Sequence, residues 1–484
     1  MGDGLFIDLT DQRAPEVAPS VGRPRLREPV RDQIELRAVD LDSVIGTDHP
    51  ARLFWAYVQR LDLSELEDAI KSRAGGAGHP AAAPRLLLAL WLFATSEGIG
   101  SARALDELCR SHDAYRWLCG GVSLNYHTLS DFRVAHGDLL DELLTQNVVA
   151  LAAAGLIDLD GLAHDGMRLR AAAGSASFRR RAKLEEQLAQ ARALVAELKA
   201  EVDAQPGISR TRLQAAKERA ARERAERLAQ ALAKHAEIAA AREPKAKRPR
   251  TAAKPATSAP PEASGETAPP APAVAATVAA SEAVADSQRQ AEPRVSTTDP
   301  QARIIKMPDG GFRPGYNAQI TTATASSIIV GIAVETSSSD AGLLQSALQQ
   351  AQARYGRLPA DCLVDGGFNK NDDIEWAAAQ GVAVHCPPVK NKHKTDPFAP
   401  RDDDGPGVAA WRIRMASETG KARYKLRNIT ECVHGRMRQN NLYQITVRGL
   451  AKAKTVLLLH ALSNNVLQGH RLACQAAQPT RAAA

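Results

Sequence analysis

The chain has 484 residues, enough for two or three domains with sizeable cores. It carries 62 lysines and arginines against 55 acidic residues, and the net charge of +7 weakly favours a polyanionic partner. Six scattered cysteines form no C-x-x-C pair, which argues against a zinc module, and the acidic start does not resemble a signal peptide.

No segment of the sequence is expected to cross a membrane. The longest apolar run extends from Leu86 to Ala94, far short of the ~20 residues that a spanning helix needs. We therefore expect a soluble, cytoplasmic protein with free thiols and no membrane partner.

Residues 31–155 are expected to form a helical domain after a flexible N-terminus, residues 1–30. Pro84 can begin a helix and Ser101 can cap the next, while Asn125 or Thr128 can cap a third after two glycines. This succession is typical of a helix-turn-helix DNA-reading unit, but any small helical bundle would look alike. In a DNA-reading unit, the side chains facing the groove would be Asn125, His127, Ser130 and Arg133.

The pattern changes at residues 156–181, the expected first part of an α/β domain. A short strand ends on Asp165 and stops at Gly166. In residues 182–243, apolar side chains at steps of four and three predict a coiled-coil hairpin around a Pro-Gly turn. A single solvated helix that frays is the alternative.

The remainder of the α/β domain is expected at residues 295–470. A Pro/Ala-rich disordered linker, residues 244–294, precedes it, and a flexible tail, residues 471–484, follows. In order, we expect a hairpin (316–323 and 327–335), a helix, a strand ending on Asp365, a helix and a strand (382–385). A helix (426–440), a strand (442–447) and a closing helix follow. This mixed α/β plan is compatible with a ribonuclease-H-like domain interrupted after its first strand.

Two strands of this plan each end on an aspartate that glycine follows, Asp165 and Asp365. Asp-Gly after a strand is usually a turn. Two such ends in one sheet, however, can bring two carboxylates together, and a divalent cation would relieve their repulsion.

A third acidic residue lies in a polar helical stretch. Tyr424, Arg427, Glu431 and Arg438 are spaced by three, four and seven residues, which places them on one helix face. The alternative is a surface face on which Arg427 neutralises Glu431.

Together these pieces resemble the DDE transposases of bacterial insertion sequences, whose third acidic residue lies in a Tyr-x2-Arg-x3-Glu-x6-Lys signature. Arg438 stands where the family has lysine, Arg168 is the basic residue after the first aspartate, and Phe368 takes the aromatic place after the second. The resemblance covers roughly residues 30–180 and 295–470. It implies a helical N-terminal domain and a ribonuclease-H-like catalytic domain with a helical insertion.

The resemblance also implies a site and its partners. Asp165, Asp365 and Glu431 would be catalytic and would hold two Mg²⁺ or Mn²⁺ ions, which prefer oxygen ligands. Tyr424, Arg427 and Arg438 would hold DNA phosphates or a flipped base. The partner would be double-stranded DNA. The protein would bind it as a homodimer at paired element ends and would therefore associate with the nucleoid.

A basic cluster lies between the second and third acidic residues, at Lys390, Lys392 and Lys394. It could contact DNA, as could Arg168 and Arg133, or it could form a solvated loop. Three other functions stay open. They are a ribonuclease-H-fold nuclease without strand transfer, an inactive transposase-derived DNA-binding protein, and a coiled-coil scaffold.

Overall fold

The computed structural model describes residues 38, 40–73, 80–203, 212–242, 292–389 and 396–478. The chain divides into two compact units, Met1–Val44 and Ile45–Ala484. In the first unit, Leu41–Val44 form one 3-10 turn. The second unit holds the helices and strands described below. Among the described residues, no helix is both long and apolar enough to cross a membrane.

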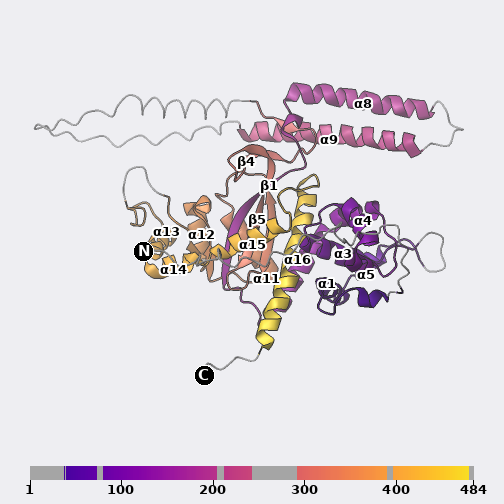
Figure 1. Ribbon diagram of the computed structural model, residues 1–484. Coiled ribbons are helices and arrows are strands. Elements are labelled where there is room, and N and C mark those ends of the chain that lie inside the picture. Colours follow the sequence, from indigo (N-terminus) through magenta and orange to yellow (C-terminus); the bar gives the residue numbers. More distant parts are fainter. Residues whose placement is uncertain are drawn as a thin grey trace, which may run out of the picture. The chain divides into compact units, whose positions relative to one another are not determined.

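In the described residues, helices α1–α7 precede the first strand of the second unit. Figure 1 shows α1, α3, α4 and α5 grouped beside the C-terminal helix α16. Pro84 begins α3 and Ser101 caps α4, as the sequence predicted, and Asn125 caps α6. α3 is buried almost all round because α1, α5, α6 and the C-terminal helix α16 pack against it. The helices are α1 (Pro50–Gln59), α2 (Ser64–Asp68), α3 (Pro84–Ser96), α4 (Ala102–Ser111), α5 (Asp113–Cys119), α6 (Tyr126–Ala135) and α7 (Gly137–Ala153).

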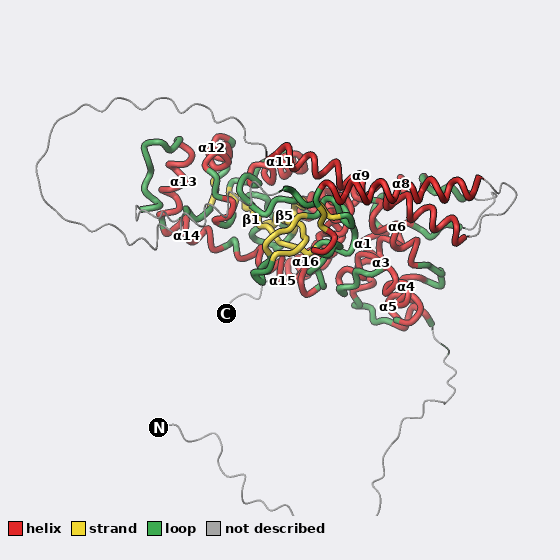
Figure 2. The backbone as a smooth tube through the Cα atoms, turned by 90° about the horizontal axis from the view of Figure 1, so that it is seen from above, coloured by secondary structure: helices red, strands yellow, loops and turns green. Residues whose placement is uncertain are grey.

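A mixed sheet forms the centre of the second unit, as expected of a ribonuclease-H-like fold (Figure 2). β5 lies between β1 on one edge and β4 and β6 on the other, all antiparallel, whereas β7 and β8 continue parallel to β1. The strands are β1 (Gly161–Arg170), β4 (Arg303–Lys306), β5 (Phe312–Ala323), β6 (Ile329–Glu335), β7 (Asp361–Leu363) and β8 (Ala383–His385).

Helices cover this sheet and supply its core. α11 contacts β6, α12 and α13 contact β8, and α15 contacts both β1 and β5. The 28-residue helix α16 packs against β6, where Asn465 hydrogen-bonds both backbone groups of Ile329 at 2.8 Å. The helices are α11 (Leu344–Tyr355), α12 (Asn371–Ala379), α13 (Pro406–Ala416), α14 (Glu418–Lys425), α15 (Asn428–Gln439) and α16 (Leu450–Ala477).

Between β1 and β4 the chain forms two long helices, α8 (Arg181–Asp203) and α9 (Arg212–Arg242). They pair through a shared apolar cluster of Leu184, Leu188, Ala191, Leu228, Ala231 and Val295. β2 (Phe178–Arg179) and β3 (Val295–Ser296) pair antiparallel and bring the start and end of this excursion together. Residues 1–30 and most of the predicted linker at 244–294 lie outside the described residues.

Four element predictions need correction. β1 does not stop at Gly166 but continues to Arg170, because β5 pairs with it along this length. Residues 442–447 form only an isolated bridge, between Gln444 and Arg170. The predicted single helix through Tyr424 and Arg438 is broken at Leu426 and Arg427, between α14 and α15. α16 also extends to Ala477, into the segment expected to be a tail.

Candidate functional site

Asp165 lies in β1, with its side chain facing α15. Its carboxylate accepts hydrogen bonds from the backbone N–H of Gly166 at 2.8 Å and from Arg427 at 3.2 Å. Only 14% of the side chain is exposed. Burial and the negative charge of Asp365 raise the pKa of Asp165 to about 6, although Arg427 partly opposes them. Asp165 therefore occupies a site where negative charge is incompletely balanced.

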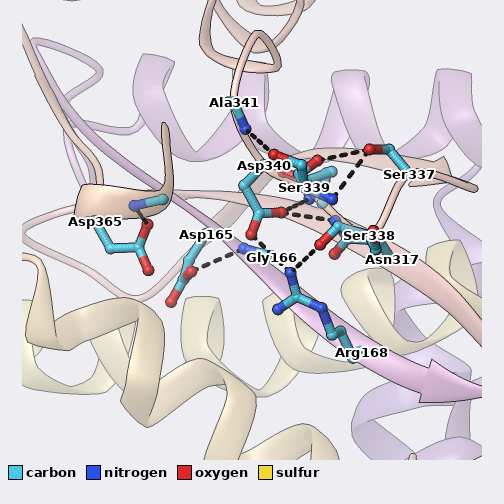
Figure 3. Close-up of polar contacts among 12 residues, drawn as sticks. Asp165, Gly166, Arg168, Asn317, Ser337, Ser338, Ser339, Asp340, Ala341 and Asp365 are labelled. Carbon is cyan, nitrogen blue, oxygen red and sulfur yellow. Dashed lines mark hydrogen bonds and ion pairs between the residues drawn. The ribbon is translucent and has the colours of Figure 1, made fainter. Parts of the chain in front are cut away.

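Asp365 follows β7, the parallel neighbour of β1, and caps the short 3-10 turn Gly366–Phe368 (η3). Its carboxylate accepts from the N–H of Gly367 at 2.8 Å. The register of β1 and β7 ends at Ala163 and Leu363, so both aspartates follow the point where the two strands separate. Figure 3 shows their carboxylates on neighbouring segments, and the negative charge of Asp365 helps to raise the pKa of Asp165. The sheet thus brings the first two predicted acidic residues together.

Arg427 connects the third predicted acidic residue to the first. Its guanidinium donates to Asp165 at 3.2 Å and to Glu431 at 2.6 Å, and it is itself only 14% exposed. Glu431 lies in the first turn of α15 and is largely exposed, at 59%. The ion pair between Arg427 and Glu431 therefore exists, as the alternative interpretation of this helix anticipated, and the same arginine also reaches Asp165.

Tyr424 and His434 complete the side of the site formed by α14 and α15. The Tyr424 ring packs against the core cluster of β7, β8 and α11–α13, and the Arg427 guanidinium lies 5.9 Å from its centroid. His434 Nδ1 lies 3.9 Å from the Asp165 carboxylate. Burial lowers the pKa of His434 to about 4, so this imidazole is neutral at physiological pH.

A buried polar network lies on the opposite face of β1. Asp340, in the loop between β6 and α11, accepts from Asn317 at 2.6 Å, Gln319 at 3.0 Å and Arg168 at 3.1 Å. His164 lies in the same network, between Thr321 and Gln319, with both contacts at 2.8 Å. Burial lowers the pKa of His164 to about 4, so this imidazole is a neutral part of the core.

A cationic pocket of about 430 Å³ opens beside the end of β1. Arg170 and Arg438 line it, and among the described residues neither side chain has an ion-pair partner. Arg313 is paired with Asp309 at 2.8 Å. The lining residues are Arg168, Arg170, Met307, Pro308, Asp309, Arg313, Arg438, Leu442 and Tyr443.

The other residues predicted to contact DNA lie away from this pocket, make contacts within the protein, or fall outside the described residues. Arg133 lies inward, with its guanidinium carbon 5.1 Å from the Trp91 ring and hydrogen bonds to Gly100 and Thr446. Arg168 donates to Ser338 O at 2.7 Å as well as to Asp340. Lys390, Lys392 and Lys394 lie outside the described residues.

The oxygen atoms of Asp165 and Asp365 suit a hard cation, but Glu431 does not lie close enough to join them in this structure. No three acidic, histidine or cysteine side chains in the described part of the chain lie close enough together to coordinate one ion. The elevated pKa of Asp165 beside Asp365 is nevertheless the signature of a carboxylate pair that a cation would stabilise. Glu431 would have to give up its hydrogen bond with Arg427 to join Asp165 and Asp365 around a cation.

Sequence reasoning missed Asp340 and His434. His434 follows Glu431 by three residues, and this spacing placed it on the same helix face. Asp340 lies in a serine-rich loop with no motif of its own. Asn317 and Gln319 alternate along β5 and therefore share a face, but nothing in the sequence shows which group they bind.

Two family profiles match the chain. The profile described as "Transposase domain (DUF772)" covers residues 39–135, which include α1–α6. The profile described as "Transposase DDE domain" covers residues 287–466, which include β4–β8, Asp365 and Glu431. No curated protein and no solved structure matches the chain.

Proposed function

Because this chain belongs to the DDE transposases of insertion sequences, we propose that it cleaves DNA at element ends and joins the freed 3′ end to target DNA. Asp165, Asp365 and Glu431 would form the single site for both reactions. The observation that carries this proposal is the buried Asp165 carboxylate beside Asp365, with a pKa raised to about 6. Carboxylates held together at a cost in free energy are typical of functional sites.

Asp165 and Asp365, with Glu431 turned towards them, would hold two Mg²⁺ or Mn²⁺ ions. Bound there, the ions would supply Lewis-acid activation of the attacking hydroxyl and stabilisation of the leaving 3′ oxygen. The chain's own oxygen donors suit such hard cations. His434, neutral and 3.9 Å from Asp165, would limit the orientations of that carboxylate without adding charge.

Arg427 would have two roles at this site. In the structure it balances the negative charges of Asp165 and Glu431. When cations take over this balance, its planar guanidinium would be able to bind a DNA phosphate through two hydrogen bonds. Tyr424 packs beside it and would limit its movement.

The cationic pocket would accept the sugar-phosphate backbone next to the reacting bond. Arg170 and Arg438 present guanidinium groups there, and Tyr443 is 53% exposed beside them. Lys390, Lys392 and Lys394 remain proposed DNA contacts from the sequence alone. The homodimer on paired DNA ends and the domain limits given above likewise stay proposals that rest on the family resemblance.

Titration calorimetry with Mn²⁺ tests the metal part of this proposal. With a DNA end present, wild-type protein should bind two ions, whereas Asp165→Asn and Asp365→Asn should lose most of the heat. Asp113→Asn provides a matched control, because Asp113 pairs with Arg116 on an exposed face of α5. Equal Mn²⁺ binding by wild type and both site variants would contradict the proposal.

A further inference from the structure

The buried network behind β1 has no part in the proposed chemistry, yet it touches β1 at the residue after Asp165. Side chains alternate across a strand, so His164, Gly166 and Arg168 face away from Asp165. Their β5 partners in the antiparallel register are Thr321, Gln319 and Asn317. Asp340 reaches these residues from the loop before α11, and Figure 3 shows it on the side of β1 opposite the Asp165 carboxylate.

Gly166 leaves the space that Asp340 fills. A Cβ atom at this position would lie 2.6 Å from Asp340 Oδ1, 2.7 Å from Gln319 Nε2 and 2.8 Å from Asn317 Oδ1. Contacts this short do not occur in folded proteins, so any side chain would displace the Asp340 carboxylate. Since β1 continues through Gly166 without a turn, close approach rather than turn geometry explains this glycine.

The hydrogen-bond directions in the network follow from Asp340. Gln319 donates its amide N–H to Asp340, so its carbonyl oxygen faces His164. His164 then donates from Nε2, and its Nδ1 accepts from the Thr321 hydroxyl. Arg168 supplies the positive charge that this buried carboxylate requires, with its guanidinium 3.1 Å from Asp340 Oδ2.

We propose that Asp340 is a positioning residue for the cleavage site, and that its carboxylate, inserted at Gly166 and paired with Arg168, holds β1 from behind Asp165. Arg168 is thereby assigned to this clamp and not to DNA. The clamp fixes the strand at the residue next to the proposed metal ligand, where small displacements are costly. This inference rests on the proposed function for its effect on rate, but the clamp itself can be measured without DNA.

The test compares Asp340→Asn with the double variant Arg168→Gln/Asp340→Asn. The single variant leaves the half-buried Arg168 without its counter-ion, whereas the double variant restores a neutral amide pair of similar size. In the single variant we expect cleavage at saturating DNA to slow by about 100-fold with KM little changed. Amide hydrogen exchange in residues 161–170 should become faster. The double variant should recover most of both losses.

Asp141→Asn is the matched control. Asp141 pairs with Arg354 in a similarly buried ion pair between α7 and α11, away from β1. It should lower the melting temperature without changing cleavage or exchange in β1.

Wild-type cleavage by Asp340→Asn would overturn the proposal. So would a double variant that restores exchange but not cleavage, since the negative charge itself would then be required. If the wild-type protein does not cleave at all, the proposed function fails, and exchange in β1 alone decides the clamp. Equal exchange in Asp340→Asn and Asp141→Asn would then reject it.

Discussion

At Asp165, the fold holds a carboxylate in a place where its charged form is destabilised. Its pKa of about 6 lies above the usual 3.8, so the folded protein binds this proton more tightly than the unfolded protein. Stability therefore falls as pH rises between these two values, and the full penalty, about 3 kcal/mol, applies above pH 6. A bound cation would remove much of it.

Asp165→Asn should consequently stabilise the metal-free protein at pH 7.5. The neutral amide avoids the repulsion from Asp365, so the melting temperature should rise by a few degrees. At pH 4, where Asp165 is already protonated in the folded state, the two proteins should melt alike. Calorimetric melts in chelator at both pH values check this. A lower melting temperature for the variant at pH 7.5 would mean that the contact with Arg427 outweighs burial.

Gly166 allows a second prediction at the same scale. Gly166→Ala should destabilise the protein by about 1–3 kcal/mol, because its methyl group overlaps Asp340 and Gln319. Gly174→Ala is the control, since a Cβ there meets nothing within 4 Å and its φ of −89° suits alanine. Urea unfolding of both variants measures the difference. Equal stability of the Gly166→Ala and Gly174→Ala variants would show that Asp340 and Gln319 can move aside at little cost.

Among the elements, α16 contributes a side chain that hydrogen-bonds the free backbone edge of β6. Asn465 is fully buried and satisfies both the N–H and the C=O of Ile329. Because β6 pairs only with β5, these groups have no strand partner on the other side. The helix thus replaces a neighbouring strand at this point.

Asn465→Ala should therefore cost about 2–4 kcal/mol, since it leaves two buried backbone groups without partners. Gln468→Ala, a half-buried position on the same helix, should change stability by under about 0.5 kcal/mol. Urea unfolding distinguishes the two. A small loss for Asn465→Ala would indicate that water reaches Ile329.

The sequence predicted the elements better than their ends. Pro84 and Ser101 mark helix starts locally, and the apolar spacing of residues 184–202 predicted a helix that the structure contains. β1 was predicted too short, because glycine usually marks a turn and its role beside Asp340 depends on tertiary contact. The break between α14 and α15 was also missed, because no glycine or proline marks it in the sequence.

The same limit applied to the site. Asp165, Asp365 and Glu431 could be singled out because they follow strands or share a spaced motif. Asp340 and His434 become apparent only when the sheet brings them to β1. Arg133 and Arg168 look alike as basic residues in the sequence, but in the structure Arg133 lies over the Trp91 ring and Arg168 pairs with Asp340.

At the scale of the whole molecule, the paired helices α8 and α9 are an excursion that the sheet does not require. Arg179 pairs with Val295, so the chain leaves and returns at neighbouring positions of one small ladder. The apolar cluster of these helices is mostly internal to the pair. We propose that they serve dimer contacts or grip DNA.

Replacing residues 182–292 with a short Gly-Ser linker should leave the sheet folded, because the β2–β3 pair can close over the gap. Complexes containing two DNA ends should become weaker, while single-end cleavage continues. Gel shift and light scattering on end-bearing DNA measure this. Unchanged assembly and cleavage would remove any role of the hairpin in either process.

The most direct test of the central claim is cleavage and strand transfer of end-bearing DNA with Mg²⁺ or Mn²⁺. Wild type is compared with Asp165→Asn, Asp365→Asn and Glu431→Gln. We expect activity in the wild type and a loss of several orders of magnitude in each variant, with DNA binding retained. Activity that survives in one variant would remove that residue from the site. A wild-type protein that binds its cognate end but never cuts it would contradict the account and favour an inactive DNA-binding protein.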